Sequence, residues 1–195
     1  MRPGVTVYFV RHGQTDWNAA ARYLGQRDIP LNDTGRGQAK RNGEMLARTL
    51  ATPTTLDYVA SPLSRARETM QIMRRALDLP ELDYRTDDLL KELHYGHWEG
   101  RLASDLAIQD PEGVAVRQKD PFRWRPSDGE SYADLMARTD AWLESVTRDT
   151  VVASHGGVSR TVRGRVLGLA DEEMMRLEVP QDRILVLRDG TASWL

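Results

Sequence analysis

Three short, mainly apolar runs, each followed by a cluster of polar and glycine residues, place the strongest constraint on how this chain folds. The run 5–10 (VTVYFV) is continuous, which is typical of a strand buried on both faces of a sheet. The runs 56–60 (LDYVA) and 150–153 (TVVA) predict two further strands. Because segments with helical spacing follow each run, the sequence predicts an α/β fold with a largely parallel sheet.

The segments between these strands carry the signals of amphipathic helices. After Asn32, apolar residues recur at Ala39, Met45, Leu46 and Leu50. Ser61 and Pro62 predict the start of a second helix, with serine as the N-cap and proline at the first helical position. Its apolar stripe would consist of Leu63, Ala66, Met70, Met73 and Leu77. Ser131 and Asp134 form a capping-box pattern before a third helix, and a fourth follows position 157 with Val158, Val162, Val166 and Leu169.

The remaining segments complete a three-layer α/β sandwich, with a mainly parallel central sheet flanked by helices. Residues 83–88 (DYRTDD) predict a weaker strand, and the end of the chain predicts a hairpin around Asp189 and Gly190. The stretch 89–129 holds Gly, Pro, Trp and scattered charge with little periodicity. We expect a single domain over 1–195, with 89–129 as an irregular insertion over one end of the sheet.

Composition excludes several classes of protein. The chain has 27 basic and 29 acidic residues, a net charge of −2, which disfavours nucleic acid or a membrane surface as a partner bound mainly by charge. It has no cysteine, which excludes disulfides, thiol catalysis and cysteine-ligated zinc. No apolar run approaches the roughly 18 residues of a membrane helix, so we expect a cytoplasmic protein. The oligomeric state is left open.

The predicted strands end in residues that carry chemistry. The first ends in Arg11 and His12, the second is followed by Arg65, and a later one ends in His155. Because ligands of such sheets bind beyond the carboxyl ends of the strands, these side chains are expected to converge. Helix N-termini at the same edge add free N–H groups and partial positive charge. Such a pocket suits a compact dianion, and phosphate is the obvious candidate.

A histidine in a phosphate pocket has three available roles: cation, general acid or nucleophile. A neutral imidazole can attack phosphorus and form a phosphohistidine, which divides one difficult step into two. Arginines then stabilise the charge on the non-bridging oxygens. A carboxylic acid nearby would supply the proton that the leaving oxygen needs.

Six motifs in order carry a resemblance to a known family. They are RHGQTDWN, DIPLNDTGRGQA, SPLSRARET, KELHYGHWEG, GES and SHGG. In this order they resemble the histidine phosphatase superfamily, in the branch of cofactor-dependent phosphoglycerate mutases and related phosphatases. The resemblance spans nearly the whole chain.

The resemblance implies a role for each matching residue. His12 is the nucleophile that becomes phosphorylated, Arg11, Arg65 and His155 hold the phosphoryl group, and Glu92 acts as general acid and later as base. The positions implied to bind phosphate or substrate are Gln14, Asn18, Gly25 and Gly156. No cofactor and no metal site is implied, and the partner is a small phosphorylated metabolite.

Departures from the family pattern bear on the reaction. Gln14 stands where glutamate is frequent, and Leu24 stands where relatives are often polar. After Gly96 the chain lacks the asparagine–lysine pair of glycolytic mutases and is shorter than they are. A shorter, more open site favours hydrolysis, so a phosphatase is preferred. The alternatives are mutase-type phosphoryl transfer and a non-catalytic relative that binds phosphorylated ligands.

Other motifs have simpler interpretations. His94 and His97 have the spacing of a metal site but lack further ligands. Glu99 is the alternative to Glu92 as the acid, and Tyr95 and Trp98 favour packing over substrate contact. The triplet 33–35 (DTG) occurs once, before a helix, which favours capping. The esterase elbow and the P-loop pattern are both absent.

Overall fold

The computed structural model describes residues 1–195, and its strands form one six-stranded sheet. The strands are β1 (Thr6–Arg11), β2 (Asp57–Ala60), β3 (Arg85–Thr86), β4 (Thr150–Ser154), β5 (Ile184–Arg188) and β6 (Thr191–Trp194). Their order across the sheet is β3-β2-β4-β1-β5-β6. The neighbouring strands β3, β2, β4 and β1 run parallel. Strand β5 pairs antiparallel with β1 on one side and with β6 on the other. The predicted sheet and the final hairpin are confirmed.

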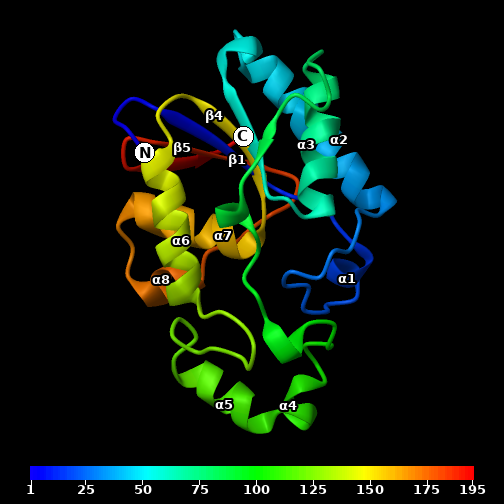
Figure 1. Ribbon diagram of the computed structural model, residues 1–195, viewed down its shortest axis with the longest axis vertical. Helices are drawn as coiled ribbons and strands as arrows, with labels where there is room; N and C mark the ends of the chain where they lie inside the picture. The colour runs from blue at the N-terminus through cyan, green and yellow to red at the C-terminus, as the bar shows by residue number, and fades with distance from the viewer.

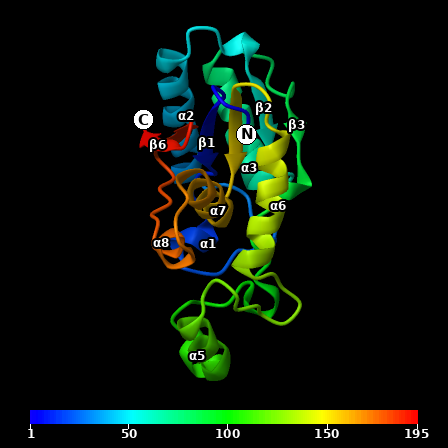
Figure 2. The same cartoon turned by 90° about the vertical axis from the view of Figure 1, so that its left-hand side faces the viewer.

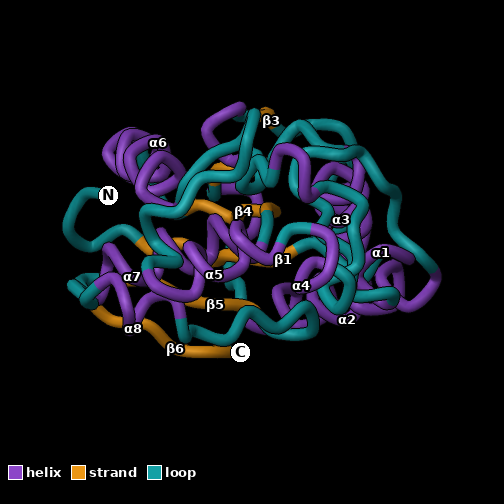
Figure 3. The backbone as a smooth tube through the Cα atoms, turned by 90° about the horizontal axis from the view of Figure 1, so that it is seen from below, coloured by secondary structure: helices purple, strands orange, loops and turns teal.

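Helices cover both faces of this sheet. They are α1 (Asp16–Ala19), α2 (Asp33–Thr49), α3 (Ser64–Ala76), α4 (Leu106–Gln109), α5 (Pro111–Lys119), α6 (Tyr132–Ser145), α7 (Gly156–Leu167) and α8 (Asp171–Met175), with short 3-10 turns η1 (Pro53–Thr55), η2 (Asp88–Leu90) and η3 (Gly96–Trp98). Helices α2 and α3 lie on one side of the strands, and α6 and α7 lie on the other (Figures 1 and 3). The three-layer arrangement is therefore as predicted.

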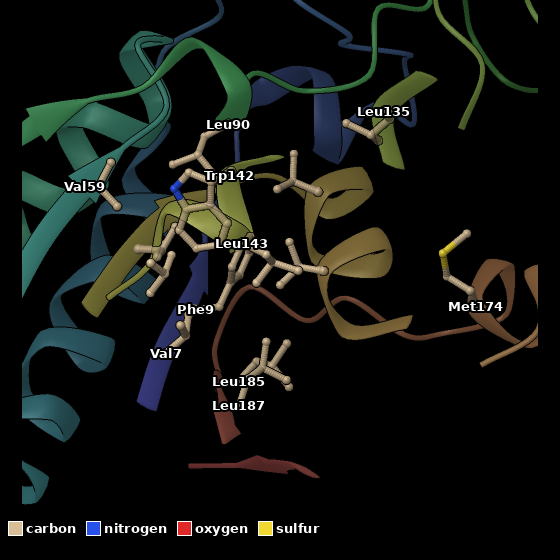
Figure 4. Close-up of a cluster of buried hydrophobic side chains, with 14 of the residues drawn as sticks. Val7, Phe9, Val59, Leu90, Leu135, Trp142, Leu143, Met174, Leu185 and Leu187 are labelled. Atoms are coloured by element: carbon tan, nitrogen blue, oxygen red, sulfur yellow. The ribbon is translucent and has the colours of Figure 1, made fainter. Parts of the chain in front are cut away.

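The alternation of side chains along the strands divides the core into two halves. Phe9 of β1 is buried with Trp142 and Leu143 of α6 (Figure 4). Val10, the next residue of β1, points to the opposite face and joins the cluster that includes Met70 of α3. This alternation follows from the two-residue period of a strand. Burial on both faces holds β1 rigidly up to its end at Arg11, directly before His12.

The register of the parallel strands aligns their carboxyl ends. Arg11 pairs with Ser154, and Ala60 pairs with Ala153. The ladder continues beyond the strands, because the His12 N–H donates to the Ser154 carbonyl and the Ser61 N–H donates to the Ala153 carbonyl. The segments that follow β1, β2 and β4 therefore leave the sheet at one edge.

Two details of the predicted helices were wrong. Helix α3 begins at Ser64, with Leu63 rather than Ser61 at the N-cap, because Ser61 is still held in the ladder to β4. Met45 of α2 was expected on the buried stripe, but it is exposed at 36%. The close packing of α2 against α3 instead uses Gly43, where a Cβ would contact Met73. The capping box of Ser131 and Asp134 is present at the start of α6 as predicted.

The stretch 89–129 is more regular than expected. It contains α4 and α5, which project beyond the carboxyl ends of the strands (Figures 1 and 2). Asp110 caps α5 by accepting from the Gly113 N–H, and Pro111 occupies its first turn. The periodicity was missing because α5 buries no residue fully and presents no apolar stripe. Helix α8 was also not anticipated.

Candidate active site

The hydrogen bonds of His12 determine which of its ring nitrogens is free to react. Its Nδ1 lies 2.7 Å from the Gly13 carbonyl oxygen. Because a carbonyl only accepts, Nδ1 carries the proton and Nε2 carries the lone pair. The Arg65 Nε–H donates to this Nε2 at 3.3 Å. The imidazole is thus held in the tautomer that a nucleophile needs.

The surroundings of His12 keep its ring neutral. The side chain is buried, and burial is the main reason that its pKa lies well below the ordinary value. The positive charges of Arg65 and Arg11 lower this pKa further. A neutral, oriented imidazole at neutral pH follows from these contacts.

His155 stands beside His12 at the end of β4. The two ring centroids are 5.1 Å apart. Nε2 of His155 lies 2.7 Å from the Ser61 Oγ, whereas its buried Nδ1 has no hydrogen-bond partner. Burial, and then the charge of Arg65, hold its pKa well below the usual range. His155 occupies the N-cap position of α7, but its side chain makes no capping bond.

Two arginines flank the histidines: Arg65 is fully buried and Arg11 is partly buried. Arg11 donates from Nη1 to the Val179 carbonyl at 2.6 Å, and its Nε has no partner. Arg65 donates to the Arg27 and Gly25 carbonyls, each at 2.7 Å. Burial lowers the pKa of Arg65 to about 10, so the guanidinium stays charged at neutral pH. Both side chains are oriented by backbone carbonyls before any ligand binds.

Glu92 faces the same group of residues from the segment after η2. Its carboxylate accepts from the Gly157 N–H at 3.1 and 3.2 Å, and from the Leu93 N–H at 2.9 Å. A Cβ at position 157 would collide with this carboxylate, so any larger residue there would displace Glu92 from its present position. The N-terminus of α7 thereby holds Glu92 in place.

Most predicted binding residues surround a cavity of about 260 Å³ next to His12. Asn18, Gly25 and Gly156 line it, as do four of the five predicted catalytic residues, which are Arg11, His12, Arg65 and Glu92. The fifth, His155, does not line the cavity, but its ring packs against the ring of His12. Gln14 does not line this cavity. Its Oε1 accepts from the Asn32 Nδ2 at 3.1 Å, which ties it to the start of α2.

Some of the other residues discussed from the sequence line the cavity, and others pack away from it. Leu24 and Tyr95 line the cavity. Trp98 is fully buried, and its Nε1 donates to the Asp110 carboxylate at 2.7 Å. His97 Nε2 lies 2.9 Å from the same carboxylate. His97 and Trp98 therefore support the fold of the insertion and do not face the cavity.

The second histidine of the possible metal pair is also engaged within the chain. His94 accepts from the Gly96 N–H through Nδ1 at 3.3 Å. No group of three or more His, Asp or Glu side chains in the structure is arranged to hold a metal ion.

Several residues near the cavity were not singled out from the sequence. Arg22, Tyr23 and Arg160 line it. Arg160 lies one helical turn after Gly156, which is a spacing that could have placed it beside the site. Gln181 donates to the His12 carbonyl at 3.0 Å, and no local pattern marks it.

The charges of the cavity favour an anion. Four arginines line it against a single carboxylate; they are Arg11, Arg22, Arg65 and Arg160, with Glu92 as the acid. The first N–H groups of α7 add to this positive field.

Elsewhere in the molecule, no helix has the length and apolar character needed to cross a bilayer.

Comparison with known proteins agrees with this geometry. The model of the histidine phosphatase superfamily (branch 1) matches residues 7–194. A glucosyl-3-phosphoglycerate phosphatase of Mycolicibacterium vanbaalenii is 32% identical over 95% of this chain and 80% of its own length. A 2,3-bisphosphoglycerate-dependent phosphoglycerate mutase of Gloeobacter violaceus is 28% identical, over 87% of this chain and 79% of its own.

A solved structure extends the likeness to the whole fold. A mycobacterial glucosyl-3-phosphoglycerate phosphatase in complex with VO3 superposes with a TM-score of 0.82, at 26% identity, over 98% of this chain and 97% of that one. The family suggested by the six motifs is confirmed. This chain belongs to branch 1 of the histidine phosphatase superfamily.

Proposed function

We propose that this protein is a phosphomonoester hydrolase that acts on a small phosphorylated metabolite through a phosphohistidine intermediate. The observation that carries this proposal is the state of His12, which is neutral and buried, with an unprotonated Nε2 that accepts only the Arg65 Nε–H. Relatives named as phosphatases support the reaction class. One of them is an adenosylcobalamin/alpha-ribazole phosphatase of Salmonella typhimurium, 29% identical over 90% of this chain and 86% of its own.

The proposed reaction has two steps. In the first, Nε2 of His12 attacks phosphorus, the bond to the ester oxygen breaks, and Glu92 donates a proton to the leaving alcohol. In the second, the Glu92 carboxylate takes a proton from water as the water attacks the phosphohistidine, which releases inorganic phosphate and restores His12. Arg11 and Arg65 stabilise the charge on the non-bridging oxygens in both steps.

Phosphoglycerate mutase activity is the second candidate, and the mutase-named relative is the observation that favours it. Both reactions share the first step and differ in whether water or a second substrate takes the phosphoryl group. The cavity next to His12, which we call the catalytic cavity, shares the lining residue Tyr23 with a wider cleft. Hydrolysis is preferred because the chain lacks, after Gly96, the asparagine–lysine pair of glycolytic mutases. Release of phosphate from 3-phosphoglycerate, compared with its conversion to the 2-isomer, separates the two reactions.

Trapping the intermediate tests the proposal. Rapid quenching with labelled substrate should give an acid-labile, base-stable label on His12. The label and the activity should both be lost in His12→Gln. The matched control is His94→Gln, because His94 lies outside the cavity, and it should label as the parent does. A fully active His12→Gln variant, or label on a serine, would refute the mechanism.

We also propose that the reaction needs no metal ion. Two arginines and the N-terminus of α7 supply positive charge where a metal would otherwise neutralise the phosphate. Exhaustive treatment with EDTA should therefore leave the steady-state rate unchanged. Loss of activity that one divalent ion restores would contradict this part of the proposal.

A further inference from the structure

A second, larger cavity shares one lining residue with the catalytic one. It has a volume of about 1220 Å³, compared with about 260 Å³ for the catalytic cavity, and Tyr23 lines both. We call it the outer cleft. Its walls come mainly from α4, α5, the segment 120–123 and α8. Figures 1 and 2 show α4 and α5 below the body of the molecule, with α8 above them. Sites for small molecules usually measure about 300–1,000 Å³, so the catalytic cavity alone is small for a whole substrate.

Arg117 of α5 holds Tyr23 in the wall between the two cavities. Its Nη1 donates to the Tyr23 hydroxyl at 2.8 Å. Its guanidinium carbon lies 5.6 Å from the ring centroids of Tyr23 and Trp98, and 5.8 Å from that of Trp124. The Tyr23 ring also meets the Tyr95 ring edge-on, with centroids 4.8 Å apart. Arg117 thus joins the insertion to the loop that carries Tyr23, through a hydrogen bond and cation–π contacts.

The outer cleft is electrically balanced, unlike the catalytic cavity. Four basic residues and four acidic residues line it; they are Arg117, Lys119, Arg123 and Arg176, with Asp120, Asp171, Glu172 and Glu173. Several of them pair with each other. Arg123 contacts both Asp120 and Asp171, and Arg176 contacts Glu172. An anion is therefore drawn to the catalytic cavity, and the outer cleft offers hydrogen-bonding groups and aromatic faces to a neutral group.

We propose that the outer cleft binds the alcohol part of the substrate, and that this part is a neutral, polyhydroxylated group of about disaccharide size. Tyr23 contacts the substrate where it passes from one cavity to the other, and Arg117 is a positioning residue that acts through Tyr23. The inference rests on the proposed function for the identity of the reacting phosphate ester. It adds the class of alcohol that the enzyme prefers.

Binding and turnover of two matched esters test this inference. Glycerol 3-phosphate and trehalose 6-phosphate are both esters of primary alcohols, so they differ mainly in the size of the neutral group. We expect the inactive His12→Gln variant to bind the disaccharide ester at least tenfold more tightly by calorimetry, and the parent to turn it over with a higher kcat/KM. Equal affinities for the two esters, or a preference for a nucleoside monophosphate over the disaccharide ester, would overturn the proposal.

Variants of the wall separate positioning from general stability. Arg117→Ala should reduce the preference for the disaccharide ester by roughly tenfold, mainly through KM, because it removes a charged hydrogen-bond donor. Tyr23→Phe removes only the hydroxyl and should lose part of the same preference. Arg101→Ala is the matched control, since Arg101 belongs to the insertion but its side chain contacts Gln109 instead. An equal loss for both esters in Arg117→Ala would mean that Arg117 is merely structural, which contradicts the proposal.

Product inhibition gives a readout that the catalytic cavity does not control. With p-nitrophenyl phosphate as substrate, free trehalose should inhibit the parent about tenfold more strongly than Arg117→Ala, whereas inorganic phosphate should inhibit both alike. If trehalose does not inhibit the parent, the outer cleft does not bind such a group. Because the calorimetric affinities need no turnover, they test the outer cleft even in a protein without phosphatase activity, and absent turnover would contradict only the proposed function.

Discussion

At the scale of single residues, Glu92 and Glu99 differ in what surrounds them. Glu92 lines the catalytic cavity. Glu99 is almost fully buried outside that cavity, where its carboxylate accepts from the Gln26 N–H at 2.8 Å and pairs with Arg27 at 3.4 Å. These contacts give Glu99 a role in holding the loop 25–27. Glu92 therefore remains the proposed acid.

The proposed proton-donor role of Glu92 predicts a dependence on the leaving group. An alkoxide needs a proton as it leaves, whereas a nitrophenolate is already a stable anion. Glu92→Gln should slow the pre-steady-state burst with alkyl phosphates by about 10²–10⁴-fold, the usual scale of general-acid catalysis. The burst with p-nitrophenyl phosphate should slow far less.

The control for this experiment is Glu99→Gln, which should keep the parent's ratio between the two burst rates. Equal slowing of both substrates in Glu92→Gln would mean that Glu92 orients the phosphate rather than donating a proton. No slowing of either would assign the acid to another group.

At the scale of elements, Arg138 connects α6 to the segment that carries Glu92. Its Nη1 donates to the Leu89 carbonyl at 2.7 Å and the Lys91 carbonyl at 2.6 Å. Its Nη2 donates to the Glu92 carbonyl and to Glu130, and its Nε donates to Glu130, each at 3.0 Å. All five N–H donors of the guanidinium are thus used. Through this side chain, α6 helps to fix the backbone of the segment that carries Glu92, whose carboxylate is held by α7.

Arg138→Lys should therefore impair catalysis, because lysine keeps the charge but cannot reproduce the planar fork. We expect kcat for an alkyl phosphate to fall by roughly 10–100-fold with a smaller change in KM, the scale of a small misplacement at an active site. The burst with p-nitrophenyl phosphate should fall less, as for Glu92→Gln.

Arg165→Lys is the matched control, since Arg165 on α7 pairs with Asp140 at 3.3 Å and has no hydrogen bond to the segment that carries Glu92. It should have the parent's kinetics. An Arg138→Lys variant that melts at a lower temperature but keeps the parent's kcat would show that Arg138 stabilises the fold without positioning Glu92.

At the scale of the whole molecule, the two buried histidines link stability to pH. The pKa of His12 and of His155 is lower in the folded protein than the unfolded value of about 6.5, chiefly through burial and secondly through Arg65. Below pH 6.5 the unfolded chain binds protons that the folded chain does not. The contribution of the two histidines to the free energy of unfolding should therefore be complete above this pH and should decrease as the pH falls.

The expected slope is up to about 1.4 kcal/mol per pH unit for each histidine that stays neutral in the folded state. Urea unfolding at several pH values between 7.5 and 5 measures it. His155→Gln should lower the slope by about half, whatever its effect on stability at pH 7.5. The same free energy of unfolding at pH 7.5 and pH 5.5 in the parent would contradict the assignment.

Local patterns were enough to predict much of this molecule. Strands β1, β2 and β4 follow from their apolar runs, and the capping box of Ser131 follows from side-chain bonds within three residues. The turn follows from the Asp189–Gly190 pair, which adopts φ angles of 45° and 76°. Placing His12 and His155 at strand ends also placed them at one sheet edge, since parallel strands share their direction. These features depend on neighbours along the chain, which the sequence displays directly.

The tertiary structure decided the contacts between distant segments. Arg117 meets Tyr23 across 94 positions, and Arg138 meets the Glu92 carbonyl across 46. Gln14 is turned away from the cavity by Asn32. No periodicity or motif encodes such pairs, because an arginine on a helix has the same local signature whether it faces water or a carbonyl. Its partner is chosen only when packing brings the two segments within hydrogen-bond distance and removes the competing water.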